Sequence, residues 1–432
     1  MGLPPLRLPS RNRLAPRAVA GAGIAILALW LAACSSGDTV PVASSPPPAQ
    51  QQPQPQVQQP LPPAGSLELG RSLPETAPAV PAGPPRIALL VPLTGRAAGV
   101  GLAMRNAAEL ALFEIADDEF ALSVHDTGST PDGAAAAAQK AIAGGARLIV
   151  GPLFATGVSA VAPIARPAGV PVIAFSNDRS VAGDGVWVFG LLPGQQVQRV
   201  TAYAASRGLT RFGALVPANA FGSTALQALN ATVARTGGAV VASDSYPTGR
   251  GTENGPLVRS FAQRIGASAD GTPYIDAVLV PDGGSEIRNL APLMAYYDID
   301  NAKVRYLGST LWNDPELGRE PALAGGWFAA PSPQTRRPFE QRYRSVFGAA
   351  PAGLASLAYD AVSLAAVMAR QPGGPAFDRE SLTQPSGFAG VDGLFRLMPD
   401  GSNQRGLAVL QLTPSGIEIQ DPAPISFEPL LN

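Results

Sequence analysis

The chain has 432 residues and a formal net charge of −1, with 31 basic side chains against 32 acidic ones. Binding to nucleic acid phosphates needs a clear basic surplus on one face, so this balance argues against a nucleic acid partner. The chain contains one cysteine and one histidine. It therefore has no cysteine pair for a disulfide, and we expect no metal site built from nitrogen and sulfur ligands.

The first 33 residues are interpreted as a targeting segment rather than part of the fold. Four arginines precede an apolar run over residues 18–33, which is sixteen residues long. A membrane-spanning helix needs about 20 apolar residues, and a shorter run after a basic segment is typical of a secretory signal peptide. We expect residues 1–33 to be a signal peptide, with an anchoring helix as the alternative.

The apolar run ends in Leu-Ala-Ala, directly before Cys34. This order resembles the lipobox of bacterial lipoproteins, in which a signal peptidase cuts before the cysteine and the cysteine is then acylated. The resemblance implies a periplasmic protein anchored by lipid at Cys34, and Ser35 in the next position favours the outer membrane in that class. The alternative is a leftover thiol at the end of an ordinary signal peptide.

Residues 34–85 have the composition of a disordered tether. Between Ser35 and Pro85 the chain has 14 prolines, 7 glutamines and no aromatic residue. Such a stretch cannot bury enough apolar surface to offset the entropy that is lost on ordering. Proline-rich chains also favour the extended polyproline II conformation. We therefore expect a spacer that holds the folded part away from the anchor.

From residue 86 the sequence alternates between short apolar runs and helical patterns, which predicts parallel βαβ units. The expected strands cover residues 87–91, 122–124, 148–150, 172–175, 212–216, 240–243, 277–280 and 304–307. The expected helices cover residues 101–115, 131–142, a segment from 156, 195–207, 223–236, 339–347 and 354–368. The sequence thus predicts an α/β fold of two doubly wound lobes with a cleft between them.

The two lobes are expected to exchange segments. We assign to lobe 1 residues 86–191 and 310–388, which include a short strand near Trp327. We assign to lobe 2 residues 192–309 and 389–432.

An antiparallel hairpin is expected near the C-terminal end. Residues 394–398 and 407–412 are the two apolar arms, and a turn-rich Pro-Asp-Gly-Ser sequence follows the first arm at 399–402.

The side chains that enzymes use for catalysis are sparse. Neither a Gly-x-Ser-x-Gly nucleophile elbow nor a Gly-x-x-x-x-Gly-Lys-Ser/Thr phosphate loop occurs. The single histidine, His125, stands beside Asp126 at the end of a predicted strand, where we interpret it as a structural residue. The sequence therefore predicts a non-catalytic protein that uses no cofactor and no metal.

Polar or glycine-rich loops follow several predicted strands, which is where open α/β sheets bind their ligands. Each loop taken alone is also compatible with ordinary turn chemistry, so the prediction depends on their shared position. The residues expected to line the cleft are Thr94, Gly95, Arg96, Phe154, Ala155, Thr156, Ser176, Asn177, Phe221, Asp282, Thr310 and Trp312.

Several motifs occur in the order typical of the type I periplasmic-binding superfamily. They are residues 87–95 (Ile-Ala-Leu-Leu-Val-Pro-Leu-Thr-Gly), 150–153 (Val-Gly-Pro-Leu), 276–280, 307–309, 358–361 and 390–396. From residue 86 to about 422 the chain resembles this superfamily, especially its branched-chain amino-acid-binding branch and the penicillin-binding protein activator lipoproteins.

These resemblances imply two different roles. The activator lipoproteins imply a regulator of peptidoglycan synthesis that reaches a peptidoglycan synthase from the outer membrane. The branched-chain branch implies the alternative, a receptor for an amino-acid ABC transporter. Such receptors hold the carboxylate and ammonium groups of a small polar ligand with two loops of one lobe and an acidic residue of the other. The corresponding segments here are Ala155-Thr156 and Ser176-Asn177-Asp178, with Thr310-Leu311-Trp312 near the place of the acid.

Overall fold

The computed structural model describes residues 84–115, 121–266, 274–371 and 376–427. All of them lie within one compact unit of the chain, Ala77–Asn432. The expected signal peptide, Cys34 and the tether up to residue 83 lie outside the described residues.

The first lobe is built on a five-stranded parallel sheet with the spatial order β2-β1-β3-β4-β5. Its strands are β1 (Arg86–Val91), β2 (Ala121–Asp126), β3 (Ala146–Val150), β4 (Val172–Ala174) and β5 (Val186–Val188). All of β1 after Arg86 is buried, as expected for a central parallel strand that is covered on both faces.

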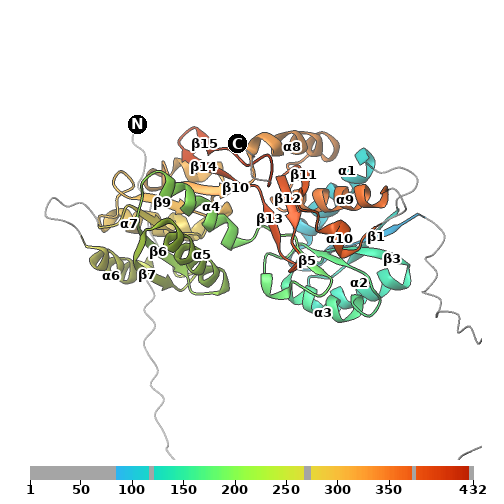
Figure 1. Ribbon diagram of the computed structural model, residues 1–432. Coiled ribbons are helices and arrows are strands. Elements are labelled where there is room, and N and C mark those ends of the chain that lie inside the picture. The colour runs from blue at the N-terminus through green and yellow to red at the C-terminus, as the bar shows by residue number, and fades with distance from the viewer. Residues whose placement is uncertain (1–83, 116–120, 267–273, 372–375, 428–432) are drawn as a thin grey trace, which may run out of the picture. The chain divides into compact units, whose positions relative to one another are not determined.

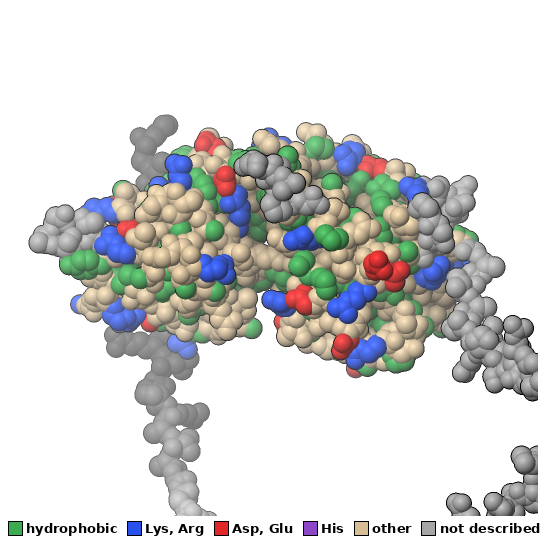
Figure 2. All heavy atoms as spheres, in the orientation of Figure 1, with side chains coloured by type: hydrophobic (Ala, Val, Ile, Leu, Met, Phe, Trp, Pro, Cys, Tyr) green, Lys and Arg blue, Asp and Glu red, His purple; other side chains and the backbone are tan. Residues whose placement is uncertain are grey.

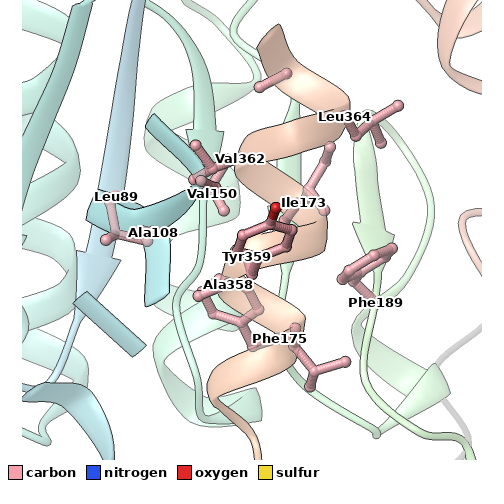
Figure 3. Close-up of a cluster of buried hydrophobic side chains, with 14 of the residues drawn as sticks. Leu89, Ala108, Val150, Ile173, Phe175, Phe189, Ala358, Tyr359, Val362 and Leu364 are labelled. Carbon is pink, nitrogen blue, oxygen red and sulfur yellow. The ribbon is translucent and has the colours of Figure 1, made fainter. Parts of the chain in front are cut away.

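Helices cover both faces of this sheet (Figure 1). One face packs against α2 (Pro131–Ala143) and α3 (Ala155–Ala165). The other face packs against α1 (Ala98–Ile115), α8 (Pro333–Phe347) and α9 (Ala355–Ala369). In Figure 3, Ala358, Tyr359 and Val362 of α9 lie among sheet side chains that include Val150 and Ile173.

The start of α2 illustrates how local sequence sets an element boundary. The hydroxyl of Thr130 accepts a hydrogen bond of 3.1 Å from the N–H of Gly133, and Pro131 occupies the first helical position. Both features are favourable at a helix N-terminus, so this boundary confirms the one predicted from the sequence.

The second lobe contains a seven-stranded mixed sheet with the order β15-β14-β10-β9-β8-β6-β7. Its strands are β6 (Arg211–Pro217), β7 (Ala239–Tyr246), β8 (Ala277–Leu279), β9 (Arg305–Gly308), β10 (Trp327–Ala330), β14 (Ala408–Thr413) and β15 (Gly416–Asp421). On one face lie α4 (Pro193–Ser206) and α5 (Ala220–Thr236), and on the other α6 (Gly255–Ile265) and α7 (Gly284–Tyr296).

Short elements complete the described fold. They are the 3-10 turns η1 (Arg179–Val181), η2 (Gly251–Asn254), η3 (Thr310–Trp312), η4 (Pro315–Arg319) and η5 (Pro321–Leu323), and the one-turn helix α10 (Arg379–Leu382). A three-stranded antiparallel sheet is formed by β11 (Phe388–Gly390), β12 (Gly393–Leu397) and β13 (Asn403–Arg405).

This small sheet belongs to the first lobe. The side chains of Phe395 and Leu397 on β12 lie in the core that α1 and α9 share with the five-stranded sheet. The side-chain nitrogen of Asn403 donates hydrogen bonds of 2.9 Å to the carbonyls of Val188 and Gly190. The chain therefore passes between the lobes at residues 189–192, at 331–332 and at 406–407.

The expected division of the lobes is corrected at two places. Residues 310–330 belong to the second lobe, because β10 pairs with β9 and β14. Residues 389–405 pack on the first lobe, as the buried Phe395 shows. The reason is that β10 is buried along its whole length, so its sequence does not reveal which sheet it joins.

The expected C-terminal hairpin is also wrong. The turn at 399–402 is present, and the N–H of Met398 donates to the carbonyl of Ser402 at 2.8 Å. However, β12 pairs with β11 and β13, while β14 pairs with β10 and β15. The returning arm, β13, has the polar sequence Asn-Gln-Arg, which does not resemble a strand.

The surface carries charges of both signs. On the face shown in Figure 2, basic and acidic side chains are scattered among uncharged ones rather than gathered into one patch. Within the described ranges, no helix combines the length and the apolar character that crossing a bilayer requires.

Candidate functional site

Two neighbouring cavities lie where strand-following loops of both sheets meet. We call the first the apolar chamber; its volume is about 390 Å³. Its apolar lining residues are Ala97, Val100, Leu153, Phe154, Phe175, Leu191, Phe221, Leu311, Leu354 and Leu357, and its polar side chains come from Asn177, Gln196 and Thr310.

We call the second cavity the polar chamber; its volume is about 630 Å³. Its polar lining residues are Asn177, Asp178, Arg179, Ser180, Gln195, Gln198, Thr224 and Ser402. The rest of its lining consists mainly of small residues at the starts of α3, α4 and α5, among them Ala155, Gly194 and Ala220.

The two chambers are adjacent because they share lining residues. Asn177, which follows β4 in the first lobe, and Phe221, in the first turn of α5 in the second lobe, line both cavities. Phe154 lines the apolar chamber and its neighbour Ala155 lines the polar one. This arrangement places the carboxyl ends of strands from both sheets around one site, as in other open α/β folds.

The apolar chamber has one cation beside it. The described residues that line it include no charged side chain. The guanidinium carbon of the exposed Arg96 lies 5.1 Å from the centre of the Phe154 ring, within the range of a cation–π contact. An anionic group at this edge of the chamber would therefore meet a positive charge, and no carboxylate of the lining would repel it.

The charged side chains of the polar chamber already take part in hydrogen bonds or an ion pair. The carboxylate of Asp178 accepts hydrogen bonds from the N–H and the hydroxyl of Ser180, at 2.9 and 2.7 Å. Arg179 forms an ion pair with Asp400. The hydroxyl of Ser402 also donates to Asp400, and together these contacts hold the pKa of Asp400 below its ordinary value.

Five of the twelve predicted cleft residues line these cavities. Phe154, Asn177, Phe221 and Thr310 line the apolar chamber, and Ala155 lines the polar one together with Asn177 and Phe221. Arg96 lies against Phe154 without being part of the lining.

Thr94 and Gly95 shape the loop after β1 instead of facing a cavity. The carboxylate of Asp126 accepts hydrogen bonds from the Thr94 hydroxyl at 2.6 Å and from the N–H groups of Leu93 and Thr94. Although desolvation alone would raise it, these bonds hold the pKa of Asp126 below its ordinary value. Gly95 has a φ of 79°, and a Cβ there would lie 2.7 Å from the carbonyl oxygen of Gly128, so this position requires glycine.

Trp312 is a core residue rather than a cleft residue. Its side chain is fully buried in the core beneath α6 and α7, and its indole N–H donates to the carbonyl of Asp282 at 2.8 Å. The Asp282 carboxylate accepts a hydrogen bond of 3.0 Å from the Tyr246 hydroxyl. Neither Trp312 nor Asp282 lines either chamber, so the expectation that Trp312 faces the cleft is corrected.

Ser176 and Thr156 also lie outside the lining. Ser176 is buried, and its hydroxyl accepts a hydrogen bond of 3.1 Å from the N–H of Asp178. Thr156 is exposed on α3. Ser176 therefore stabilises the loop after β4, while Thr156 lies on the surface of α3. Neither side chain faces a chamber.

Several lining residues were not predicted from the sequence. Leu354 and Leu357, at the start of α9, come from a segment more than 160 residues after β5, and no local pattern relates them to the cleft. Gln196 is 4% exposed and belongs to the buried side of α4, together with Val197 and Val200. A glutamine on the buried face of an amphipathic helix was the one available signal.

No metal centre is found among the described residues, since no group of three or more histidine, cysteine, aspartate or glutamate side chains could hold an ion there. His125 lies 3.1 Å from the Ser123 hydroxyl, and its burial lowers its pKa. These contacts fit the structural role that we expected for it.

Comparison with known protein families identifies a match over most of the chain. The model of a family described as periplasmic binding protein matches residues 84–416. That range begins just before β1 and ends at the first residue of β15.

Solved structures with the same fold include ABC transporter components. A Rhodospirillum rubrum protein assigned to branched-chain amino acid ABC transport is 20% identical with a TM-score of 0.66, and the match covers 78% of this chain and 99% of that one. The substrate-binding protein LivJ of Streptococcus pneumoniae, in complex with isoleucine, is 19% identical with a TM-score of 0.58 over 78% of this chain and 100% of that one.

A third structure holds an aromatic acid. The solute-binding protein of an ABC transporter from Rhodopseudomonas palustris BisB5, in complex with 3,4-dihydroxybenzoic acid, is 20% identical with a TM-score of 0.58 over 79% of this chain and 98% of that one. At these identities, all three likenesses show the fold alone.

A curated relative matches over a shorter stretch. Uncharacterized protein RP748 of Rickettsia prowazekii (strain Madrid E) is 28% identical over 143 residues, which make up 33% of this chain and 38% of that protein. The match thus spans well under two thirds of the relative's length.

Proposed function

The chain belongs to the periplasmic binding protein family, and from that premise we propose that it is an extracytoplasmic receptor that binds a small apolar carboxylate for an ABC importer. The observation that carries the proposal is the apolar chamber, whose lining comes from both lobes and which has Arg96 at its edge. Its volume of about 390 Å³ lies within the usual range of small-ligand pockets, roughly 300–1,000 Å³.

The lining favours a carboxylate without an ammonium group over an amino acid. A buried ammonium needs an acidic partner, and leaving it unpaired costs several kcal/mol. None of the described residues that line the apolar chamber is acidic. The nearby Asp126 carboxylate is occupied by the loop after β1, where it accepts the Thr94 hydroxyl. An amino acid, the ligand expected from the branched-chain branch, is therefore the second candidate.

Calorimetric titration of the full chain tests the ligand class. Benzoate should bind more tightly than benzamide, which has the same ring without the negative charge. Arg96→Gln should weaken benzoate binding about tenfold, the effect of losing roughly 1.4 kcal/mol of charge-assisted attraction, and leave benzamide unchanged. Arg259→Gln is the matched control, because Arg259 is exposed on α6 and lines neither chamber.

Two outcomes would overturn the proposal. Leucine or isoleucine binding more tightly than every carboxylate without an ammonium group would replace it with the amino-acid receptor. If none of these ligands binds, the protein is not a receptor for small apolar carboxylates.

The role of a peptidoglycan synthase activator gains no support from the chamber or from the comparisons. The structural neighbours are components of ABC transporters, which favours the receptor. A pull-down of a peptidoglycan synthase by the full chain, unaffected by a substitution in the apolar chamber such as Phe221→Ala, would reverse this preference.

The lipid anchor at Cys34 is part of the proposal. An anchored receptor stays close to the membrane that contains its importer or to the outer membrane that Ser35 favours. Cys34→Ala should move the protein from the detergent phase to the aqueous phase in a partitioning assay, while Ser35→Ala should leave it in the detergent phase. Unchanged partitioning of the Cys34 variant would exclude the anchor.

A further inference from the structure

The two chambers differ in chemistry and share Asn177 and Phe221. From this geometry we infer that the receptor takes an elongated carboxylate whose far end carries an uncharged hydrogen-bonding group, such as an amide or a hydroxyl, which the polar chamber holds. The inference deepens the proposed function and depends on it.

Continuity between the chambers is the first step. Phe221 lines both cavities, and of the consecutive residues Phe154 and Ala155 the first lines the apolar chamber and the second lines the polar one. Because the cavities adjoin at Asn177 and Phe221, a solute whose apolar body lies against Phe154 would have its far end directed at the polar chamber.

The polar chamber is suited to an uncharged group. Ser180 donates both of its hydrogen bonds to Oδ1 of Asp178, and Arg179 is paired with Asp400. A second carboxylate on the ligand would thus find no unpaired cation among the described residues of the lining, and it would face the negative charge of Asp178. A neutral polar group meets no such penalty.

Two side-chain amides remain for the ligand. In the described part of the chain, the side chains of Asn177 and Gln198 make no hydrogen bond, and both are exposed in the lining of the polar chamber. Each amide offers two N–H donors and one carbonyl acceptor. Together they match a ligand group that both donates and accepts, which is the character of an amide or a hydroxyl.

Small residues keep this chamber open. Gly194 is the second residue of α4, and a Cβ at this position would lie 3.8 Å from the Thr224 methyl and 3.9 Å from the Cβ of Ala228. Ala220 and Ala228 of α5 also line the chamber. A large side chain at position 228 would therefore fill the polar chamber from the second lobe, and Ala228 itself does not line the apolar chamber.

Para-substituted benzoates test the inference on the full chain. The first series ends in a primary amide with zero, one or two methylene groups between ring and amide, and the matched series ends in isopropyl, which has the shape of the amide without its hydrogen bonds. At the best length, the amide should bind about tenfold more tightly than both benzoate and its isopropyl counterpart, the effect of one or two net hydrogen bonds.

Two variants locate the effect. Gln198→Leu should remove most of the amide's advantage, and Ala228→Phe should abolish it by filling the chamber, while both variants bind benzoate as the unmodified chain does. Gln198 is exposed on α4, whereas Ala228 is partly buried against the core of the second lobe, so unchanged benzoate binding also checks that each variant folds.

The outcomes separate this inference from the proposed function. Benzoate binding with no advantage for any amide, or an advantage that survives in both variants, would overturn the elongated ligand and leave the receptor in place. Failure of every carboxylate to bind would overturn the proposed function, and this inference with it.

Discussion

The side-chain oxygen of Gln196 accepts a hydrogen bond of 2.8 Å from the backbone N–H of Thr310. The side-chain nitrogen of Gln196 donates to the carbonyl of Leu191 at 2.9 Å. One buried amide thus ties the segment that crosses between the lobes to the loop after β9. All three residues line the apolar chamber, so this bridge fixes part of the binding surface as well as the crossing.

Replacing Gln196 with leucine should destabilise the fold. The change leaves the partly buried N–H of Thr310 and carbonyl of Leu191 without these partners, which costs up to about 1–3 kcal/mol. Urea denaturation of the variant measures this loss. Gln198→Leu on the same helix is the control, because Gln198 is exposed and makes no hydrogen bond in the described part of the chain; equal stability of the two variants would contradict the bridging role.

The contact between Gly308 and Trp312 provides a second test. A Cβ at Gly308 would lie 2.1 Å from the Trp312 ring, far inside any allowed contact. Because the indole is fully buried, it has no room to retreat, and Gly308→Ala should lower the free energy of unfolding by at least about 1–3 kcal/mol. The measurement is again chemical denaturation.

Gly99→Ala is the matched control for that substitution. Gly99 lies in the first turn of α1, and a Cβ there meets nothing within 4 Å. Alanine is favoured over glycine in helices by roughly 0.5–1 kcal/mol, so this variant should be as stable as the unmodified chain or slightly more so. A tolerated Gly308→Ala would show that Trp312 is more loosely packed than the structure indicates.

Much of the fold follows from local patterns in the sequence. The uninterrupted apolar run of β1 predicts a central strand buried on both faces, and it is one. Thr130 and Pro131 predict the start of α2, and they form it. Such features are readable because a strand covered by helices and a capped helix need particular residues at particular positions, wherever the rest of the chain lies.

Long-range relationships account for what the sequence could not predict. Whether β10 joins the first or the second sheet depends on pairing with β14, about 80 residues away. An aromatic residue after a strand fits a cleft or a core equally well, and Trp312 lies in the core because Gly308 and Gly326 leave space for its ring. The leucines at the start of α9 reach the chamber only through the return of the chain to the first lobe.

Asp276 predicts a dependence of stability on acid pH. Its carboxylate accepts hydrogen bonds of 2.9 Å from the N–H groups of Thr210 and Arg211, and it forms an ion pair with the Arg211 side chain. Desolvation alone would raise its pKa, but these partners hold the pKa of Asp276 below its ordinary value. The stabilisation is therefore present above the pKa of the unfolded state and is lost as the pH falls through the folded-state pKa.

Asp276→Asn isolates this contribution. The variant should be less stable than the unmodified chain at pH 7, and the difference in stability should narrow between pH 7 and pH 3, because the unfolded state takes up a proton at the ordinary aspartate pKa of about 3.9 and the folded state only at a lower one. Denaturation curves at the two pH values provide the measurement. A difference in stability that is the same at both pH values would mean that the charge of Asp276 does not contribute to the stability of the fold.

Asp360 predicts the opposite dependence near neutral pH. Its side chain is 2% exposed on α9, and its carboxylate accepts hydrogen bonds from the N–H groups of Val391 at 2.7 Å and Asp392 at 3.3 Å. Burial, together with the negative charge of Asp392, raises the pKa of Asp360 to about 7, against the opposing effect of Arg405. Between the lower pKa of the unfolded state and about pH 7, the folded state thus keeps a proton on Asp360 that the unfolded state has released.

The sign follows from this difference in bound protons. Where the folded state binds more protons than the unfolded state, stability falls as the pH rises. The contribution of Asp360 is fully present below the unfolded-state pKa and is lost as the pH rises through about 7. Asp360→Asn cannot ionise, so its stability should fall less between pH 5 and pH 8 than that of the unmodified chain.

Asp378→Asn is the control for Asp360. Asp378 caps α10 at the surface, and the hydrogen bond from the N–H of Ser381 helps to hold its pKa below the ordinary value, so it stays ionised throughout this range. That variant should keep the pH dependence of the unmodified chain. If Asp360→Asn also keeps it, the proton is not held at Asp360, and the carboxylate must be ionised and matched by Arg405 within the first lobe.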